Sequence, residues 1–299
     1  MHDSVADLNS ASYRAAVKTQ TMMMLLAGLA LGIAFLVPFF CLLLQSSTLQ
    51  PRPLPSTKKS ANGENINVLL VVAHPDDESM FFGPTLLSLA KLGVYNIHTI
   101  CMSTGNADGL GSARKSEMYT ACSVLQFEMV GQIPTANVNV VDHPSLQDGF
   151  SCQWDQSLIV KLLRQAVADH NIQIILTFDS YGISGHPNHR AVHSGVRAFL
   201  FEEGNTINSK EGSADEVIQG WELASTNMLR KYSGPFELCA LVLKRISIDE
   251  EKLHYLVNPS PRTSIVAMSQ HRSQWVWYRR LFVLFSRYTY INTLKKMSG

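Results

Sequence analysis

Stretches with strand-like and helix-like hydrophobic patterns alternate along the chain from residue 66 onward. Residues 66–73 form an almost unbroken aliphatic and β-branched run, as expected for a strand that is buried on both faces. Similar runs cover residues 95–102, 138–141 and 172–178. Helical spacing is found at residues 81–92, 113–125, 157–170 and 190–202.

Strands that alternate with helices predict an α/β domain, in which a mostly parallel sheet carries helices on both faces. A polar loop at residues 203–215 and a late strand at residues 238–246 are predicted to follow. In such a sheet, ligands bind beyond the carboxyl ends of the strands. We therefore expect the functional residues directly after residues 66–73, 95–102 and 172–178.

An uncharged apolar run at residues 22–44 precedes the domain. Its roughly 23 residues would extend about 34 Å as a helix, enough to cross the ~30 Å hydrocarbon layer of a bilayer. A cleaved signal sequence is the alternative, but no clean small-x-small cleavage site follows the run. We predict an N-terminal tail (residues 1–21), a retained single-pass transmembrane anchor (residues 22–44) and a proline-rich linker (residues 45–65).

The charges beside the apolar run indicate its orientation. Arg14 and Lys18 precede the run, whereas Arg52, Lys58 and Lys59 follow it, and this small excess places the domain in the cytosol. The five cysteines show no C-x-x-C spacing, and the chain has no acceptable N-x-[ST] sequon. Both features agree with a reducing, cytosolic environment for the domain.

The last part of the chain, residues 274–299, mixes aromatic and aliphatic side chains with basic ones. The basic residues are Arg279, Arg280, Arg287, Lys295 and Lys296. This composition is favoured at the depth of lipid headgroups, although an ordinary helix packed on the domain would also fit. We therefore predict a catalytic domain at residues 66–273, followed by a membrane-proximal tail.

Composition and charge limit the classes of function. With 46% apolar and 16% charged residues, the chain is an ordered protein. Its formal net charge of +1 gives no support to nucleic-acid binding. No motif identifies a protein partner.

The segments after two of the predicted strands carry candidate metal ligands. His74 and Asp77 lie three residues apart where the chain leaves residues 66–73, so both side chains can reach one point. His189, delivered by the loop after residues 172–178, is the candidate third ligand. Hydrolytic zinc sites commonly use three N/O ligands and leave a fourth position for water, so this set suits Zn²⁺, with iron and manganese as rivals.

The residues beside these ligands could carry the proton chemistry. Asp76 is the candidate general base, and His186 could stabilise an oxyanion or protonate a leaving group. Glu78 could cap the following helix or orient a ligand histidine. Taken singly, a D-D-E turn is usually a solvated helix start and an H-P-x-H a surface turn. Their joint occurrence after two buried strands favours a site.

These motifs resemble those of the LmbE-like, or PIG-L-like, de-N-acetylases. The family hallmark A-H-P-D-D-E is present at residues 73–78, and the family's H-P-D-H has its relative at residues 186–189, where Asn188 replaces aspartate as in the eukaryotic branch. The resemblance implies a Rossmann-like fold and a zinc ion held by His74, Asp77 and His189. It also implies that Asp76 is the base and that His186 stabilises the tetrahedral intermediate.

A glycine-rich loop extends the resemblance. Residues 103–109 match the family's T-x-G-x-x-x-G loop and include Asn106, a candidate for substrate binding; Arg114 and Glu117 follow in an R-x-x-E pattern. Arg114 is either a substrate contact or the partner of Glu117 in a salt bridge. Asn188, like Glu78, is a candidate for a supporting role behind the ligands.

The stretch at residues 269–279 resembles the end of the eukaryotic family members that act on N-acetylglucosaminyl-phosphatidylinositol. Together with the predicted anchor, it implies a deacetylase of this glycolipid, single-pass in the endoplasmic reticulum membrane, with its catalytic domain facing the cytosol. The reaction would be the second step of glycosylphosphatidylinositol-anchor synthesis. The alternatives are a catalytically silent glycolipid-binding subunit, a de-N-acetylase of another GlcNAc glycoside, and a phosphoesterase. The last is disfavoured because no carboxylate cluster for a second metal is visible.

Overall fold

The computed structural model describes residues 65–127, 137–209, 218–234, 236–238 and 253–297, with a few earlier positions (18, 21–25, 28, 53 and 54). It divides the chain into two units, Met1–Ser47 and Thr48–Gly299. Most of the predicted anchor at residues 22–44 lies outside the described residues. Among the residues that are described, no helix has both the length and the apolar character needed to cross a membrane.

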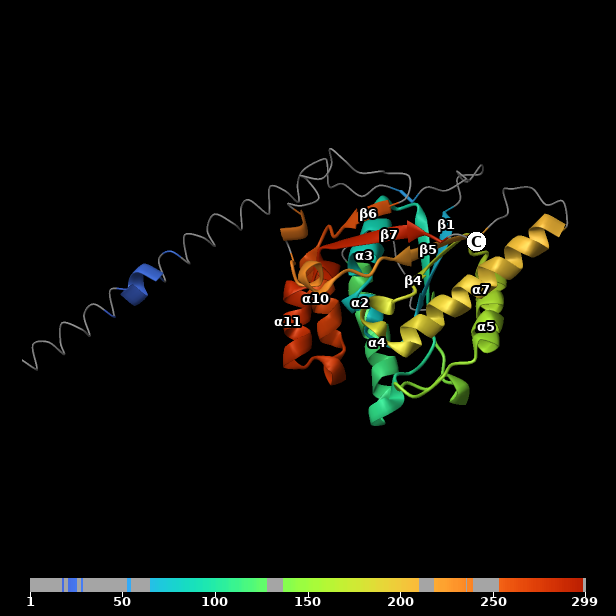
Figure 1. The fold of residues 1–299 in the computed structure, drawn as a ribbon, viewed down its shortest axis with the longest axis horizontal. Helices are drawn as coiled ribbons and strands as arrows, with labels where there is room; N and C mark the ends of the chain where they lie inside the picture. Colours follow the sequence, from blue (N-terminus) through green and yellow to red (C-terminus); the bar gives the residue numbers. More distant parts are fainter. Residues whose placement is uncertain are drawn as a thin grey trace, which may run out of the picture. The chain divides into compact units, whose positions relative to one another are not determined.

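A seven-stranded sheet forms the centre of the second unit (Figure 1). Its spatial order is β3-β2-β1-β4-β5-β7-β6. The pairs among β1 to β5 are all parallel, whereas β7 runs antiparallel to both β5 and β6. The strands are β1 (Ile66–Val72), β2 (Tyr95–Cys101), β3 (Val138–Val140), β4 (Ile174–Phe178), β5 (Gln219–Leu223), β6 (Leu253–Val257) and β7 (Ile291–Lys296).

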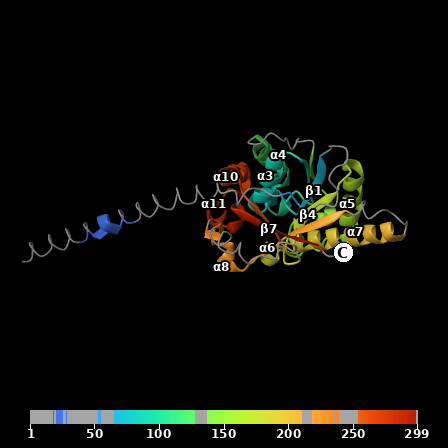
Figure 2. The same cartoon turned by 90° about the horizontal axis from the view of Figure 1, so that it is seen from above.

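Two groups of helices cover the two faces of this sheet (Figure 2). One group contains α3 (Gly83–Leu92), α4 (Gly111–Phe127) and α10 (Pro261–Gln270), and the other contains α5 (Gln156–His170) and α7 (Pro187–Ser209). The prediction of a mostly parallel α/β sheet with helices on both faces is therefore confirmed. The shorter helices are α2 (Asp77–Met80), α6 (Gly182–Gly185), α8 (Met228–Lys231) and α11 (Trp277–Phe285), with 3₁₀ turns at Asn106–Asp108, Pro144–Leu146, Arg272–Gln274 and Arg287–Thr289.

The strand order reverses between β1 and β4. From β1 the chain moves outward to β2 and β3, and it then returns to the other side of β1 with β4 and β5. In open α/β sheets, a crevice forms at the carboxyl ends of the strands where the order reverses. The segments after β1 and β4, which hold most of the candidate residues, therefore meet at this point.

Two local predictions are wrong. Helix α7 continues through Ser209, where a polar loop was predicted from residue 203, because adding residues to an existing helix is much easier than nucleating a new one. Leu238 is helical rather than the first residue of a strand, and residues 239–246 lie outside the described part of the chain. Strand β5 was not predicted, since Gln219, Gly220 and Glu222 interrupt its apolar pattern.

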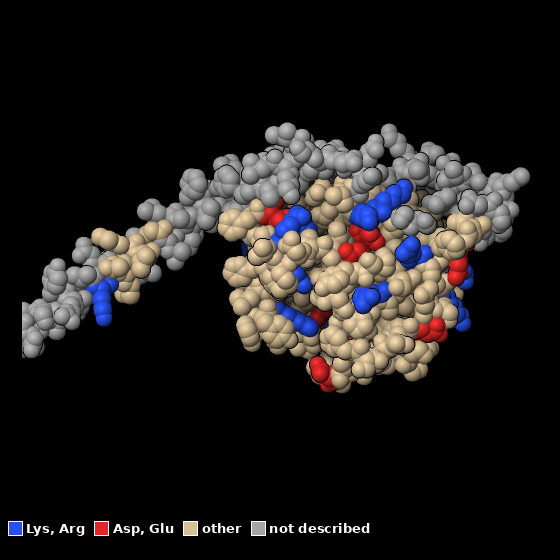
Figure 3. All heavy atoms as spheres, viewed as in Figure 1, with Lys and Arg blue, Asp and Glu red and all other residues tan. Residues whose placement is uncertain are grey.

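The predicted tail also needs correction, because much of it belongs to the domain. Residues 291–294 of β7 are buried between β5 and β6. Arg287, expected among lipid headgroups, is fully buried, and its Nε lies 3.3 Å from an oxygen of Glu237. For α11, the alternative of a helix packed on the domain holds, since Phe282 and Val283 are buried. On the face shown in Figure 3, the described lysines and arginines are scattered among uncharged side chains rather than gathered in one patch.

Candidate metal and catalytic site

The turn after β1 is held by the carboxylates of its own residues. Oδ2 of Asp77 accepts hydrogen bonds from the backbone N–H groups of Ala73 (3.1 Å) and His74 (2.8 Å). Asp76 adopts a backbone φ of 117°, a value rare for residues other than glycine, and its N–H donates to Oε2 of Glu78 (3.1 Å). Asp77 and Glu78 therefore fix a strained turn that presents His74, Asp76 and Asp77 beyond the strand.

The segment after β4 delivers two further histidines. His189 lies in the first turn of α7, and its Nδ1 contacts the carbonyl oxygen of Gly182 at 3.1 Å, which leaves Nε2 free to face the site. Gly182 has a φ of +66°, and a Cβ there would lie 2.7 Å from Cβ of His189, so this close approach requires glycine. The ring of His189 stacks on Phe178 with centroids 4.1 Å apart.

These two segments bring four candidate groups together. The nitrogen donors of His74, His186 and His189 lie within 4.8 Å of one another. Oδ1 of Asp77 lies 3.2 Å from Nε2 of His189, and its Oδ2 lies 3.7 Å from Nδ1 of His74. A cluster of imidazole nitrogens and a carboxylate fits a divalent metal such as Zn²⁺. From this geometry, His186 could either bind the metal itself or lie beside the metal and contact the substrate, as expected from the sequence.

The charge states of this cluster suit metal binding. Burial opposes ionisation of Asp77, but the charge and hydrogen bond of His189 outweigh this effect. The pKa of Asp77 is therefore held well below its usual value. Burial, together with the charges of His74 and His189, lowers the pKa of His186 to about 4. At neutral pH, Asp77 is thus a carboxylate and His186 a neutral imidazole, the forms that bind a cation or donate a single hydrogen bond.

Behind His74 lies an acid that the motifs did not reveal. Oδ1 of Asp148 lies 3.0 Å from Nε2 of His74, and Nδ2 of the fully buried Asn188 lies 3.0 Å from the same nitrogen. Burial raises the pKa of Asp148, but its hydrogen bond to His74 brings the net pKa below the usual value. Such outer carboxylates orient metal-binding histidines. Asp148 lies eight residues after β3 in an irregular loop, so only its position near the carboxyl edge of the sheet could have suggested it.

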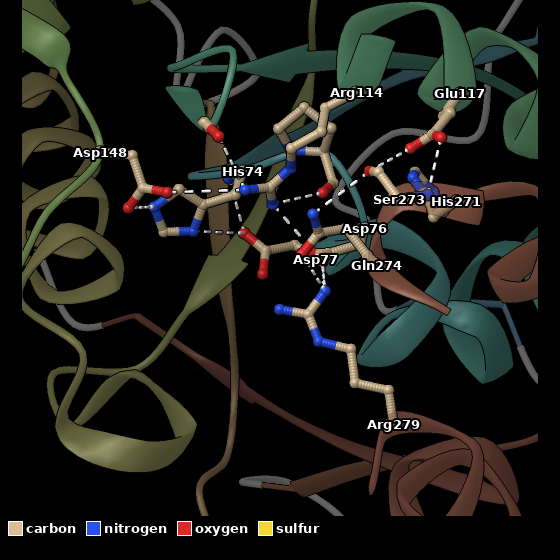
Figure 4. A network of polar contacts seen from close by, with 12 residues as sticks. His74, Asp76, Asp77, Arg114, Glu117, Asp148, His271, Ser273, Gln274 and Arg279 are labelled. Atoms are coloured by element: carbon tan, nitrogen blue, oxygen red, sulfur yellow. Dashed lines mark hydrogen bonds and ion pairs between the residues drawn. The ribbon is translucent and has the colours of Figure 1, made fainter. Parts of the chain in front are cut away.

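The candidate base, Asp76, is enclosed by two arginines (Figure 4). Its Oδ2 lies 2.5 Å from Nη1 of Arg279 and 3.5 Å from Nη2 of Arg114. Burial raises the pKa of Asp76, against the opposing effect of both arginines. A raised pKa brings a carboxylate closer to the range in which it can accept and return a proton near neutral pH.

Arg114 holds the site together from inside the protein. It donates hydrogen bonds to the carbonyl oxygens of Gly105 (2.8 Å) and Pro75 (2.9 Å), and it joins the loop after β2 to the turn after β1. The alternative of a salt bridge between Arg114 and Glu117 is wrong, because Glu117 accepts hydrogen bonds from the N–H (2.8 Å) and the hydroxyl (2.6 Å) of Ser273. The exposed Asn106 closes its own loop by accepting from the N–H of Gly111 at 2.8 Å, and its role in substrate binding stays a prediction.

Glu78 has a buried partner that neither of its expected roles included. It is fully buried within α2, where its Oε1 lies 2.6 Å from Nε2 of His271, and it accepts a hydrogen bond from Ser79 (2.7 Å). Because its Oε2 also accepts the N–H of Asp76, the residue at which α2 starts, Glu78 retains part of the expected capping role. Its histidine partner, His271, is not a candidate metal ligand. No local pattern indicates this pairing, because 193 residues separate Glu78 from His271.

Comparisons with known proteins give one consistent family. Residues 69–200 match a family model described as GlcNAc-PI de-N-acetylase. The chain is 35% identical to a probable N-acetylglucosaminyl-phosphatidylinositol de-N-acetylase of Schizosaccharomyces pombe over 81% of this chain and 93% of that protein. It is 38% identical to the N-acetylglucosaminyl-phosphatidylinositol de-N-acetylase of Bos taurus, over 78% of this chain and 84% of that protein.

A bacterial relative is more distant. The chain is 28% identical to a 1D-myo-inositol 2-acetamido-2-deoxy-alpha-D-glucopyranoside deacetylase of Thermomonospora curvata, over 42% of this chain and 49% of that protein. That relative is named for a 2-acetamido-2-deoxyglucopyranoside of myo-inositol, whereas the relatives from fission yeast and cattle are named for N-acetylglucosaminyl-phosphatidylinositol.

Proposed function

This chain belongs to the PIG-L family of GlcNAc-PI de-N-acetylases, and from that premise we propose that it hydrolyses the acetamide of N-acetylglucosaminyl-phosphatidylinositol. The products are glucosaminyl-phosphatidylinositol and acetate, so the reaction contributes to glycosylphosphatidylinositol-anchor synthesis. The observation that carries this proposal is the convergence of His74, Asp77, His186 and His189 beside the buried carboxyl of Asp76.

Each group near the site has a chemical task in this proposal. A divalent metal, Zn²⁺ by preference, held by His74, Asp77 and His189, would supply the Lewis acidity that polarises the acetamide carbonyl and activates water. Asp76 accepts a proton from the attacking water and returns it to the leaving amine nitrogen. His186 donates a hydrogen bond to the carbonyl oxygen of the acetamide, which becomes negative when water adds to the carbonyl carbon. The C=O double bond of the acetate product forms again when the C–N bond breaks and the protonated amine leaves.

Acetate release from the purified glycolipid by the full-length protein tests the proposal. We expect release to stop with a chelator and to return when Zn²⁺ is added to the metal-free protein. Glycolipid binding without acetate release would instead indicate a silent binding subunit. Release of inorganic phosphate would indicate a phosphoesterase, and equal rates on unrelated GlcNAc glycosides would indicate a broader de-N-acetylase.

The same proposal includes a membrane location. The apolar run at residues 22–44 supports a single-pass anchor in the endoplasmic reticulum membrane, with the domain on the cytosolic side. Large apolar side chains are exposed on α8 and on α11, among them Leu229 (87%) and Trp277 (72%). We propose that this surface contacts the lipid bilayer, since exposed aromatic and aliphatic side chains favour the interface.

Protease treatment of intact microsomes tests the orientation. An epitope at the C-terminus should be digested without detergent if the domain faces the cytosol, whereas protection until detergent is added would place the domain in the lumen.

A further inference from the structure

Arg279 connects the catalytic base with a helix that the sequence had assigned to a membrane-proximal tail. It lies in the first turn of α11, 203 residues away from Asp76. Its Nη1 donates hydrogen bonds to Oδ2 of Asp76 (2.5 Å) and to Oε1 of Gln274 (2.6 Å). Its side chain remains 22% exposed, whereas that of Asp76 is 5% exposed. Arg279 is therefore the outer boundary of the site at this point.

Asp76 has another cation beside it, so Arg279 is not needed merely to balance its charge. Arg114 approaches the same oxygen from the opposite side of Asp76, as Figure 4 shows, and two backbone carbonyl oxygens hold it in place. Arg114 is also almost completely buried. Of the two arginines, only Arg279 has a side chain that can leave Asp76 for a group arriving from solvent.

On its other side, Arg279 lines an apolar hollow of about 400 Å³. The remaining walls come from α2, α11 and the residue after α8, and they are Met80, Tyr232, Tyr278, Leu281, Phe282 and Phe285. Among the described residues of this lining, Arg279 is the one with a permanent charge. It thus separates a polar reaction centre from a surface suited to hydrocarbon.

A glycosylated phosphatidylinositol has the same order of parts: a polar sugar, an anionic phosphodiester and an apolar diacylglycerol. Resting on the proposed function, we propose that Arg279 is a specificity-determining residue that exchanges the carboxylate of Asp76 for the phosphodiester of the substrate. The lipid end then lies toward the hollow and the sugar toward Asp76.

The exchange has a clear physical basis. A guanidinium can bind phosphate oxygens through two parallel charge-assisted hydrogen bonds, whereas Arg279 is bound to Asp76 through Nη1 alone. The move also frees Oδ2 of Asp76, which Arg279 otherwise occupies, to accept the proton of water. A substrate without the phosphodiester provides no partner that draws Arg279 away.

Three substrates, used with the full-length protein, separate the contribution of the phosphodiester from that of the lipid. They are N-acetylglucosaminyl-phosphatidylinositol, its deacylated form that keeps the phosphodiester, and N-acetylglucosaminyl-inositol without phosphate. The readout is the ratio of kcat/KM for the deacylated diester to kcat/KM for the phosphate-free glycoside. We expect Arg279→Ala to lower this ratio by about 10- to 100-fold, as for the loss of a hydrogen-bonded charge, and Arg279→Lys to lower it less.

Two matched variants locate the effect. Arg280→Ala removes the neighbouring exposed arginine of α11, whose Nε donates to the carbonyl oxygen of Trp275, and it should leave the ratio unchanged. Arg197→Ala tests a rival anion site, because Arg190 and Arg197 line a separate hollow of about 990 Å³ over α7. A fall of the ratio in Arg197→Ala but not in Arg279→Ala would overturn the proposal. So would an equal loss on all substrates in Arg279→Ala, since that result describes a residue that only positions Asp76.

Binding of glycerophosphoinositol, measured by calorimetry, decides the question independently of turnover. The wild-type protein should bind this headgroup, and Arg279→Ala should raise the Kd by a similar factor of about 10 to 100. Equal binding by both proteins would overturn the role of Arg279. If the wild-type protein released no acetate from any substrate, the proposed function would fail, whereas the calorimetric comparison would still decide whether Arg279 binds the phosphodiester.

Discussion

Replacing His271 with alanine removes the partner of a carboxylate that has no access to solvent. Glu78 and His271 are both completely buried, with Oε1 and Nε2 2.6 Å apart. Burial disfavours the charged form of both groups. The charge and hydrogen bond of the partner outweigh this effect of burial, so the pKa of Glu78 is lowered and that of His271 is raised. The ion pair is therefore present in the folded protein at mildly acidic and neutral pH.

The expected loss of stability in His271→Ala comes from leaving Glu78 buried, charged and unpaired. Removing one partner of a buried ion pair costs about 3–5 kcal/mol, a large part of the ~5–15 kcal/mol that stabilises a typical domain. At about 2–4 °C per kcal/mol for a domain of this size, Tm should fall by roughly 6–20 °C. The double variant Glu78→Gln/His271→Ala should lose less unfolding free energy than the sum of the losses in the two single variants, because no buried charge remains in it.

Thermal and urea unfolding at pH 6 provide the assay. The pH follows from the direction of the shifts: the contribution of Glu78 is complete above its unfolded pKa of about 4.5, and that of His271 is complete below its unfolded pKa of about 6.5. His170→Ala, at an exposed position, is the control and should cost about 1 kcal/mol or less. A loss below 1 kcal/mol in His271→Ala, or additive losses in the cycle, would refute this account of the pair.

Three further predictions concern other contacts of the site. Asp148→Asn should lower metal affinity or kcat/KM by about 10- to 100-fold, because it removes the carboxylate beside Nε2 of His74. Zinc titration against a chromogenic chelator measures the affinity, and unchanged affinity and activity would contradict the prediction. Gly105→Ala should destabilise the protein by about 1–3 kcal/mol in thermal unfolding, since Gly105 has a φ of +65° and a Cβ there would lie 2.5 Å from the guanidinium carbon of Arg114; wild-type stability would show that the loop adjusts freely. Stability should fall as the pH drops below about 4.5 and Glu78 is protonated, because its folded pKa lies below the unfolded value, and Glu78→Gln should show a weaker loss over the same range.

The parallel core and the place of the site could be predicted because local patterns determine both. The run at β1 is aliphatic throughout, and the chemistry-bearing turn follows it directly, so the carboxyl-edge rule applies without tertiary information. The same rule placed His189 beside His74 and Asp77, and the structure brings these three side chains together.

The support of the site could not be predicted in the same way, because its partners are far apart in sequence. His271 and Arg279 reach Glu78 and Asp76 only after α10 and α11 have packed on the domain, and neither residue has a local pattern that identifies its partner. The basic and aromatic composition of residues 274–299 also concealed a buried strand. Residues 291–294 of β7 are buried, because this strand pairs antiparallel between β5 and β6. The lysines at its end do not prevent this burial, since Lys295 and Lys296 are exposed beyond the buried residues.

The measurement that tests the central claim most directly is single-turnover acetate release by the zinc-loaded Asp76→Asn variant. The account predicts that this variant keeps the metal content of the wild-type protein, because His74, Asp77 and His189 are unchanged, while acetate release slows by about 10²- to 10⁴-fold through loss of the base. Release at the wild-type rate with full metal occupancy would contradict the account, since Asp76 would then not carry the proton.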